Sequence, residues 1–457
     1  MNRIIKISCM SALALMMSSC HIYNKYQLPQ DNAVTADYRQ AVENQDSTGL
    51  AYMGWREIFT DPILQSYIEQ ALANNNNVDN ARLNVEMARA QLQGAKLSYL
   101  PSLAFNPNGG TASYGGSHMN WSYTLPLAAN WEIDAFGKIL NRKRGAKASV
   151  EQMQAYEQAT RSQIITGVAS TYYSLVLLHQ QLDLSKRTAE IWKDQVATME
   201  QLKQAGTTTE AAVVQSRANY YNILSTIPDL EQQITTVNNS LSVLLNTYPA
   251  DWKVSTNLDL KLPEEAVKGI PMSYLATRPD VAAAERGLAT AFYTVSSAHA
   301  NFYPSLAISA QGGFTNLLGS IITNPGKWFI QLAGSLTAPL FSRGQNIAQL
   351  KVAKAQQEQA LNNFENTVMS AAADVSDALV KIEKSSEKKR LVDMQVNELE
   401  KSVEYTNELF ILNHQTSYLE VLTARSSLLQ AQLASLSSAY ARTAALINLY
   451  QAVGGGR

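Results

Sequence analysis

This sequence of 457 residues contains little cysteine and few long apolar runs, and its positive and negative charges nearly balance. Its only cysteines are Cys9 and Cys20, too few for a disulfide framework or a cysteine-rich metal site. The formal net charge is −1, so we predict no nucleic acid partner, because such partners select strongly basic surfaces. After residue 20 no apolar run reaches the roughly 18 residues that a transmembrane helix needs, and we predict none.

Residue patterns typical of catalysis are equally sparse. The histidines are scattered and lack paired carboxylates at metal-ligand spacing. Gly137-Lys138 is followed by Ile139, whereas a phosphate-binding loop requires serine or threonine there. We therefore predict that the chain is not an enzyme, that it holds no cofactor or metal, and that any energy it uses enters through a partner.

The first twenty residues have the composition of an export signal. Arg3 and Lys6 precede a short apolar core, which ends in Ser18-Ser19-Cys20. This order resembles a bacterial lipoprotein signal, in which residues 1–19 are removed and Cys20 becomes the acylated first residue. An ordinary signal peptide with an incidental cysteine is the alternative. No acidic residue follows Cys20, which favours the outer membrane in bacteria that use acidic retention signals.

One pattern of elements occurs twice along the chain. The segment 97–103, Leu-Ser-Tyr-Leu-Pro-Ser-Leu, returns as 300–306, Ala-Asn-Phe-Tyr-Pro-Ser-Leu. Each copy is followed by alternating residues, then by a glycine turn, then by a very long helical pattern. A supersecondary unit used twice predicts one repeated architecture instead of two unrelated domains.

Four stretches alternate apolar and polar residues, which predicts strands with one apolar and one polar face. The clearest runs from Asn120 to Asp134, and the others cover 306–315, 328–340 and a weaker start at 103–105. Their length suits tilted membrane strands of roughly 9–11 residues, although a half-buried soluble sheet would alternate in the same way. Four strands cannot close a barrel, so a barrel would need several chains. Hairpin turns are predicted from Gly109-Gly110 to Ser117 and from Asn316 to Lys327.

The longest predicted helix runs from Gln345 to Asn413, a stretch without glycine or proline. Its apolar residues step by three and four, as in coiled coils, and residues 164–182 of the first copy do the same. Both helices reverse at short polar turns. We predict a stop at Gly206 with a Thr207–Glu210 capping box in the first copy, and a Ser417–Glu420 cap in the second. The return helices are expected to end near 248 and 453, followed by a disordered tail at 454–457.

These residues resemble the outer-membrane efflux channels of the TolC type, and most closely their OprM/NodT-like lipoprotein branch. The resemblance covers nearly everything after Cys20. Its most specific part is Arg278-Pro279-Asp280-Val281 with Pro304 downstream. Three further segments match the family's pattern, namely 55–64, the strand-to-helix junction 131–138 and the return-helix motif 418–428.

The resemblance implies an α+β fold with an internal two-fold repeat. Long antiparallel helical hairpins would form a periplasmic α-barrel, and four strands per chain would contribute to a twelve-stranded transmembrane β-barrel of a homotrimer. The expected layout is a lipidated N-terminal segment at 20–60, a first repeat at 61–248, an equatorial linker at 249–277 and a second repeat at 278–453. The tube would be the passive exit duct of a tripartite efflux pump for small molecules. Its expected partners are a periplasmic adaptor, an inner-membrane transporter of the RND type and outer-membrane lipid.

The resemblance also implies sites. The helical turns would dock the adaptor, through Gly206, Thr207 and Thr208 in one hairpin and His414, Gln415 and Thr416 in the other. The periplasmic gate falls at Leu419 and Thr423, but Thr423 replaces a residue that is usually acidic, so a carboxylate ring is not carried over. Leu419 suits either a hydrophobic constriction or a coiled-coil core. Arg278, Pro279, Asp280 and Pro304 are expected to be structural, bracing a helix start.

Two other functions fit the same residues. A lipid-anchored periplasmic coiled-coil scaffold or adaptor would have the long helices but would never cross the membrane. A duct for type I protein secretion would share the whole fold. The lipoprotein signal favours small-molecule efflux over protein secretion, while the cargo itself stays open.

Overall fold

The computed structural model describes residues 23–29, 33–43, 50–112, 115, 120–261, 274–275, 277–315, 327–413 and 417–456. The predicted signal segment, Cys20 and the turn residues His414, Gln415 and Thr416 lie outside these ranges. The described chain is mostly helical and contains one antiparallel sheet. None of the helices in these ranges combines the length and the apolarity needed to cross a membrane.

The elements follow one another in an order that occurs twice. The first series is α5 (Asn76–Leu97), β1 (Ser102–Phe105), β2 (Asn108–Ala112), β3 (Asn120–Ile133), α6 (Lys138–Gln204) and α7 (Glu210–Leu244). The second is α9 (Pro279–Ala300), β4 (Ser305–Thr315), β5 (Lys327–Thr337), α10 (Gln345–Asn413) and α11 (Tyr418–Ala452). Short elements precede them, namely α2 (Ala33–Glu43), η2 (Leu50–Tyr52), α3 (Trp55–Ile58) and α4 (Pro62–Asn74). Corresponding helices have similar lengths, with 67 and 69 residues in α6 and α10 and 35 residues in both α7 and α11.

The chain forms two compact units, and each draws on both halves of the sequence. The first comprises residues 1–30, 83–154 and 283–366 and contains the whole sheet. The second comprises 31–82, 155–282 and 367–457 and contains both helical turns.

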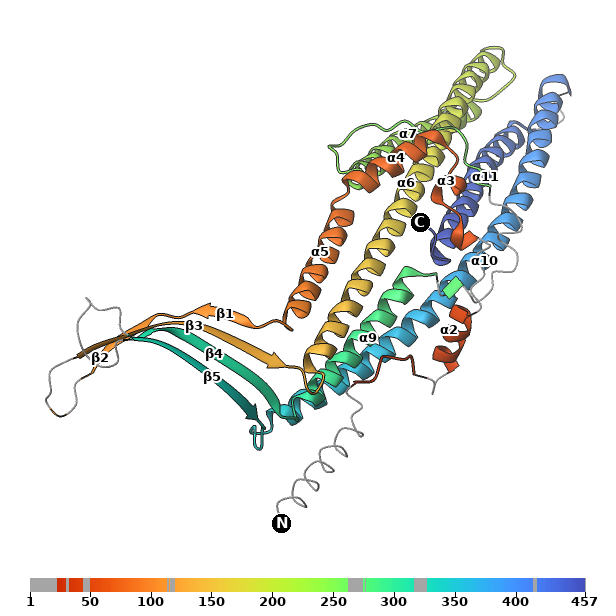
Figure 1. Cartoon of the computed structure of the whole chain (residues 1–457). Helices are drawn as coiled ribbons and strands as arrows, with labels where there is room; N and C mark the ends of the chain where they lie inside the picture. Colours follow the sequence, from red (N-terminus) through yellow and green to blue (C-terminus); the bar gives the residue numbers. More distant parts are fainter. Residues whose placement is uncertain are drawn as a thin grey trace. The chain divides into compact units, whose positions relative to one another are not determined.

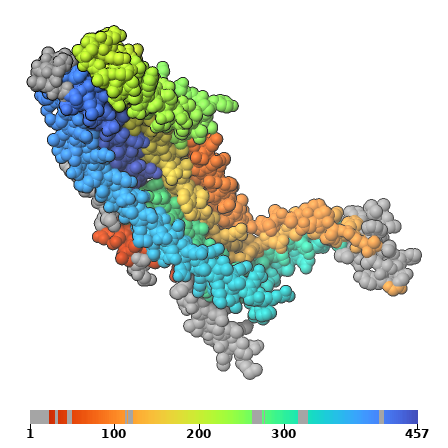
Figure 2. Space-filling model, turned by 180° about the vertical axis from the view of Figure 1, so that it is seen from behind, coloured from red at the N-terminus to blue at the C-terminus, as the bar shows by residue number. Residues whose placement is uncertain are grey.

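The sheet of the first unit has the strand order β1-β3-β4-β5, and β2 also pairs with β3 (Figure 1). In the space-filling view the orange segment of the first strands lies along the teal segment of β4 and β5 (Figure 2). The register of β1 on β3 continues without a slip into β2, since Phe105 lies opposite Leu127 and Asn108 opposite Thr124. The break falls where Asn106 faces Pro126, which accepts a bond from the Asn106 N–H but has no N–H to return. β1 and β2 are therefore one interrupted strand, and the prediction of four strands is confirmed in this sense.

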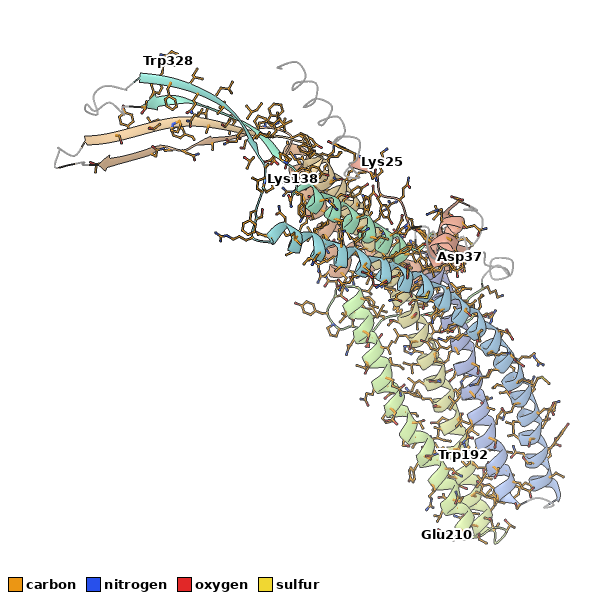
Figure 3. All side chains as sticks on the ribbon, turned by 90° about the horizontal axis from the view of Figure 1, so that it is seen from below. Lys25, Asp37, Lys138, Trp192, Glu210 and Trp328 are labelled. Carbon is orange, nitrogen blue, oxygen red and sulfur yellow. The ribbon has the colours of Figure 1, made fainter. Side chains whose placement is uncertain are left out.

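The predicted apolar face of the sheet is confirmed by the strand register. Trp131 lies opposite Ile308, and Phe314 lies opposite Trp328, so apolar residues of different strands share one side. The exposed large apolar residues on this side are Leu103, Phe105, Leu125, Leu127, Trp131, Phe314, Trp328, Ile330, Leu332 and Leu336. Trp328 lies at the end of the sheet remote from Lys138, where α6 begins (Figure 3). The other side carries polar pairs such as Gln311 and Gln331, whose side chains bond at 2.5 Å.

One predicted turn begins too early. Gly109 and Gly110 lie inside β2, opposite Tyr123 and Ser122, and the antiparallel hairpin of β2 and β3 is connected by residues 113–119, of which only Gly115 is described. A glycine pair gives a turn signal from its backbone freedom alone, but a strand can also include it where the partner strand fixes the register. The second predicted turn falls on residues 316–326, which lie outside the described residues, and Lys327 already belongs to β5.

The second unit is held together by long helices whose facing sides are buried. Trp192 of α6 packs with Ala189, with Ile223 of α7 and with Leu422 of α11 in one apolar cluster. Nearer the start of α6, its residues Ile165, Tyr172 and Leu175 are fully buried. The uninterrupted helix predicted from Gln345 to Asn413 is confirmed as α10.

Two details of the predicted helix ends need correction. The N-cap of α7 is Thr209, whose hydroxyl accepts the Ala212 N–H at 3.4 Å, and Thr207 instead donates its hydroxyl to the Leu202 carbonyl at 2.9 Å. The chain needs the two extra residues to leave the left-handed conformation of Gly206, which has φ +74°. α7 also ends at Leu244, four residues before the predicted Tyr248.

The prediction of a disordered tail is wrong for Gly454, Gly455 and Gly456, which are buried. The Gly456 N–H donates to the Tyr450 hydroxyl at 2.9 Å, and the Gly455 carbonyl accepts the Ser162 hydroxyl. A Cβ on Gly455 would lie 2.4 Å from the Tyr450 ring. Three glycines suggest flexibility from sequence, but here they permit a backbone approach that no larger residue could make.

Candidate functional site

The first helical turn is closed by backbone bonds and an ion pair. Gly206 ends α6 with its N–H on the Lys203 carbonyl at 3.0 Å, and the Thr207 N–H reaches the Leu202 carbonyl at 3.0 Å. The predicted stop at Gly206 is thereby confirmed. Lys203 pairs across the turn with Glu210, which lies at the end of the hairpin (Figure 3). These bonds leave Gly206 and Thr207 exposed and Thr208 half-buried at the turn.

The return helix of the second hairpin begins at Tyr418, after Ser417 in the N-cap position. The Tyr418 hydroxyl lies 2.5 Å from the Ser216 hydroxyl of α7, and its ring packs on Phe410 of α10 at 5.7 Å between centroids. Burial raises the pKa of Tyr418, and this effect outweighs the hydrogen bond to Ser216, which acts in the opposite direction. A neutral tyrosine therefore joins the two return helices near their turns.

The two gate candidates of the sequence lie one helical turn apart on α11. Leu419 is 66% exposed within the single chain, so it does not belong to the coiled-coil core of its own chain. Thr423 is exposed, and its hydroxyl donates to the Leu419 carbonyl at 2.8 Å. This bond leaves an apolar side chain and a threonine methyl group on one open surface. The surface has no carboxylate at position 423.

Arg425 lies on α11 just beyond these residues, in half-buried surroundings. Its Nη2 donates to the Asn407 side chain at 3.3 Å, and its buried Nε has no hydrogen-bond partner among the described residues. Burial lowers the pKa of this guanidinium. The sequence pattern placed Arg425 only inside a longer motif, and no charge pattern indicated its burial.

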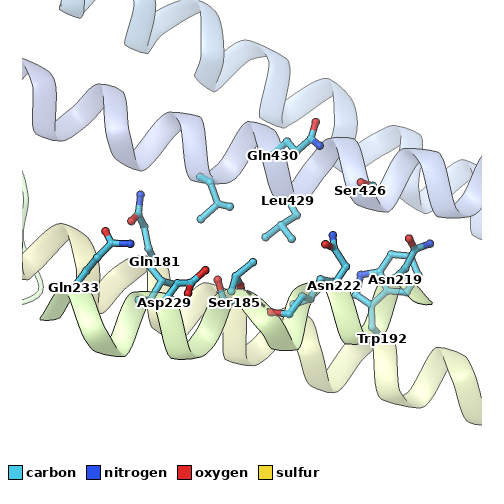
Figure 4. Close-up of a pocket in the computed structure, with 14 residues that line it drawn as sticks. Gln181, Ser185, Trp192, Asn219, Asn222, Asp229, Gln233, Ser426, Leu429 and Gln430 are labelled. Atoms are coloured by element: carbon cyan, nitrogen blue, oxygen red, sulfur yellow. Dashed lines mark hydrogen bonds between the residues drawn. The ribbon is translucent and has the colours of Figure 1, made fainter. Parts of the chain in front are cut away.

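A groove of about 390 Å³ lies between α6, α7 and α11 (Figure 4). Trp192 and Asn222 lie toward one end, and Gln181 and Gln233 toward the other, with Leu429 of α11 between them. Amide and apolar side chains line the walls in equal number, and Asp229 supplies a carboxylate. Sequence reasoning missed this groove, because its residues belong to three helices and share no local motif.

The Arg-Pro-Asp motif braces the start of α9. Pro279 is the first residue of the helix, and Arg278 donates to Asp280 at 2.6 Å, to Asp374 of α10 at 3.0 Å and to the Ala452 carbonyl at 3.0 Å. Burial disfavours the charged form of Arg278, but the two carboxylates outweigh this effect and raise its pKa. Pro304 of the same motif precedes β4 directly.

A sheet with an exposed apolar face, combined with two long helical hairpins on one chain, defines the architecture of an efflux channel. The family model described as "Outer membrane efflux protein" matches residues 67–247 and 270–455. The chain therefore belongs to the outer membrane efflux protein family, as the resemblance implied.

Named relatives and solved structures agree with this assignment. The chain is 28% identical over 413 residues to the probable outer membrane lipoprotein SilC of Salmonella typhimurium, covering 88% of each chain. It is 26% identical over 452 residues to the cation efflux system protein CusC of Escherichia coli K12, covering 97% of this chain and 98% of CusC. The open-state structure of the Neisseria gonorrhoeae MtrE outer membrane channel matches with a TM-score of 0.81 and 26% identity, covering 95% of this chain and 97% of MtrE.

The protein is thus an outer-membrane efflux channel, and it resides in the outer membrane. Channels of this family work with a periplasmic adaptor and an inner-membrane transporter. The assignment favours the channel over the periplasmic scaffold that the sequence had left open.

Proposed function

We propose that three copies of the chain form one passive tube for small molecules, with twelve strands in the outer membrane and the long helices as an α-barrel in the periplasm. The observation that carries the proposal is an exposed apolar sheet face on a sheet with two unpaired edges. Trp328 is 72% exposed and Ile330 is 76% exposed. Apolar surface on this scale is costly in water, whereas lipid accommodates it.

The edges of the sheet support assembly from several copies. β1 and β5 are the outer strands of the described sheet, and each has a partner on one side only. In lipid an unpaired backbone N–H or carbonyl costs several kcal/mol, so each edge strand of the sheet needs a further strand as its partner. Four strand positions per chain give twelve for three chains, a number in the range of known closed barrels.

An internal repeat supports this assembly. Ser102 lies opposite Asn130 in the first hairpin, and Ser305 lies opposite Thr337 in the second. Ser305 follows Ser102 by 203 residues in the sequence, and Thr337 follows Asn130 by 207 residues, so these two shifts convert the first pair into the second. The same shifts relate the starts of the flanking helices, from Asn76 to Pro279 and from Lys138 to Gln345. We therefore infer that both halves of the chain carry one duplicated unit.

The N-terminal segment supports acylation at Cys20. The Tyr23 hydroxyl donates to the Ala135 carbonyl at 2.8 Å, and Arg144 donates to the Tyr23 carbonyl at 3.1 Å. Cys20 precedes Tyr23 by three residues in the sequence. Since Ala135 follows the end of β3, an acyl group on Cys20 would enter lipid at the level where the sheet ends. The acyl group and the apolar face of the sheet would then both anchor the chain in outer-membrane lipid.

The helical turns are the proposed adaptor surface, and the adaptor would connect the tube to a transporter of the RND type. Gly206, Thr207 and Thr208 are proposed for the first turn, and His414, Gln415 and Thr416 for the second. Leu419 and Thr423 are proposed to line the periplasmic gate. The exposure of Leu419 supports this assignment, because three copies could then bring three leucines together.

Planar-bilayer recordings test the tube. Purified protein should conduct ions, and its mass in detergent should equal three chains. A charge on the lipid-facing side, Ile330→Asp, should reduce the amount of protein in the outer membrane, because charges on this side of a barrel are costly. Gln331→Asp on the opposite side is the matched control and should insert normally. Trimers that never conduct, even with the adaptor present, would refute the duct.

A further inference from the structure

A hollow of about 880 Å³ lies against α6, α9 and α10 within the first unit. Its lining on α6 includes Lys138, Arg142, Gly145 and Ser149, which are spaced by four, three and four residues and therefore share one face of the helix. The other described lining residues carry amide, hydroxyl or small apolar side chains, and none of them is an aspartate or a glutamate. The hollow therefore has two basic side chains and no carboxylate in its described lining.

The two basic side chains differ in their partners. Lys138 pairs with Glu132 of β3 at 3.2 Å, and both side chains are half-exposed. Arg142 lies one helical turn further along α6 and is exposed, and it forms no ion pair with any residue in the described ranges. The positive charge of Arg142 therefore has no counter-charge at this hollow within one copy.

The hollow opens on the polar side of the sheet. Glu132 follows Trp131 of the apolar face, and successive side chains of a strand alternate, so Glu132 belongs to the polar face. Lys138 lines the hollow and also reaches Glu132, which places both on that side. Arg144, on another face of α6, instead donates to the Tyr23 carbonyl of the N-terminal segment. In a tube whose apolar face meets lipid, the hollow faces inward.

The polar face of the sheet supplies no further carboxylate. Its residues in 122–130 of β3, in β4 and in 329–337 of β5 are serine, threonine, alanine, glycine, asparagine, glutamine, one proline and one phenylalanine. Glu132 is already paired with Lys138. These parts of the strands therefore contain no acidic side chain that could neutralise Arg142.

We infer that this hollow binds anionic groups of the transported molecules, with Arg142 as its charged contact. The inference rests on the proposed tube and names the class of its cargo, namely molecules that carry carboxylate, phosphate or sulfate groups. A guanidinium offers several N–H donors in one plane and suits such oxyanions. The amide groups of Gln345 and Gln349 on α10 add uncharged donors in the same lining. Three copies would place three such arginines around the tube.

Reversal potentials of single channels in a KCl gradient test the charge of the hollow. Recordings at about 0.01 M salt are suitable, because the Debye length of about 30 Å lets charges on the wall act across a wide tube. Arg142→Gln should lower the permeability of Cl⁻ relative to K⁺, and Arg142→Glu should lower it further, whereas Arg142→Lys should retain it. Glu132→Gln should raise it, because Lys138 then loses its counter-charge. Lys147→Gln is the matched control, since Lys147 is exposed on a different face of α6.

Pyrophosphate is the probe for binding. Added at constant ionic strength, it should shift the reversal potential of the wild type toward that of Arg142→Gln, because a bound anion offsets the charge of Arg142. The shift should be several-fold smaller in Arg142→Gln itself. Equal shifts in these two proteins would overturn binding at Arg142.

The other outcomes separate this inference from the proposed duct. Channels that conduct with the same ion preference in the wild type, Arg142→Gln and Arg142→Glu would overturn the inference and leave the duct standing. A change in Lys147→Gln in place of Arg142→Gln would show that the hollow faces outward, which also overturns it. Absence of current from every variant and from the wild type would overturn the duct itself.

Discussion

The hydroxyl of Tyr418 lies 2.5 Å from the hydroxyl of Ser216, and this bond joins the return helices of the two hairpins close to their turns. Ser216 is fully buried, and its hydroxyl also bonds to the Ala212 carbonyl at 2.8 Å. A motion that moves the two hairpins apart near their turns would break the Tyr418–Ser216 bond. The bond therefore stabilises the arrangement of the turns seen in this structure.

Tyr418→Phe is expected to favour separation of the hairpins. The variant loses one partly buried hydrogen bond, a change of about 0.5–1.5 kcal/mol, or roughly two- to tenfold in the equilibrium between arrangements. Single-channel recordings should show more frequent openings than in the wild type. Tyr405→Phe, on an exposed surface of α10, is the control and should leave the recordings unchanged. Equal opening frequencies for all three proteins would show that the bond does not restrain the turns.

Arg278→Gln should destabilise the second unit by about 3 kcal/mol, because it removes a buried guanidinium from two carboxylates and a backbone carbonyl. Asp280 and Asp374 are partly exposed, which limits the loss. Thermal unfolding in detergent measures the change. Arg286→Gln removes a half-exposed pair with Glu151 and should cost less than about 1 kcal/mol. A similar effect of both substitutions would contradict the bracing role of Arg278.

Gly455→Ala should lower the stability of the second unit. Its Cβ would overlap the Tyr450 ring, whose hydroxyl bonds to the Gly456 N–H and to the Met53 carbonyl. Overpacking of this kind typically costs about 1–3 kcal/mol. Gly167→Ala is the control within α6, where the new Cβ meets only one side chain at 4.0 Å and helix propensity improves. The melting temperatures should therefore shift in opposite directions.

Thr208→Arg should impair adaptor docking and efflux while trimers remain intact. Residue 208 lies half-buried in the turn between Gly206 and the N-cap Thr209, so a larger, charged side chain there changes the surface of the turn. Gln232→Arg, on an exposed surface of α7 far from the turn, is the matched control. Drug tolerance of the producing cells and co-purification of the adaptor measure the outcome. Thr416→Arg tests the second turn in the same way. Unchanged drug tolerance in both variants would show that the turns are not part of the adaptor-docking surface.

The strands and long helices were predictable because their signals are local. The alternation from Asn120 to Asp134 marks β3 to within one residue, and Gly344 marks the start of α10. No glycine or proline follows before Gly454, so only the polar residues 414–416 marked the end of α10 at Asn413. The turn at Gly206 was predictable from glycine's preference for the left-handed backbone conformation alone. In contrast, the tail at Gly454–Gly456 gave the local signal of a flexible end, and only long-range contacts with Ser162 and Tyr450 order it.

The candidate site was predictable in position but not in its contacts. The motif 418–428 located the turn region. Its first residue, Tyr418, bonds to Ser216, which lies 202 positions away in the sequence, and the motif does not indicate this partner. Nothing in the spacing of small polar residues separates the buried Ser216 from its exposed neighbours. The groove between α6, α7 and α11 was not predictable either, because its lining residues come from three helices and lie far apart in the sequence.

The network around Asp61 should make stability depend on acid pH. Asp61 caps α4, accepting the Ile63 N–H at 2.9 Å and the Tyr172 hydroxyl at 2.7 Å. Burial would raise the pKa of this carboxyl, but the hydrogen bond from Tyr172 and those from the backbone together lower it below 3.8. The unfolded chain then binds the proton more tightly than the folded chain does. The stabilisation is complete above the unfolded value and is lost as the pH falls through the lower folded value.

Asp61→Asn tests this dependence, because asparagine is also a good N-cap residue and keeps the side-chain oxygen. The wild type should lose stability between about pH 4 and pH 2, and the variant should lose less over the same interval. Asp183→Asn, on an exposed surface of α6, is the control and should follow the wild type. Urea unfolding at each pH, monitored by tryptophan fluorescence, measures the free energy of unfolding. Parallel curves for wild type and Asp61→Asn would mean that the acid sensitivity of the second unit originates elsewhere.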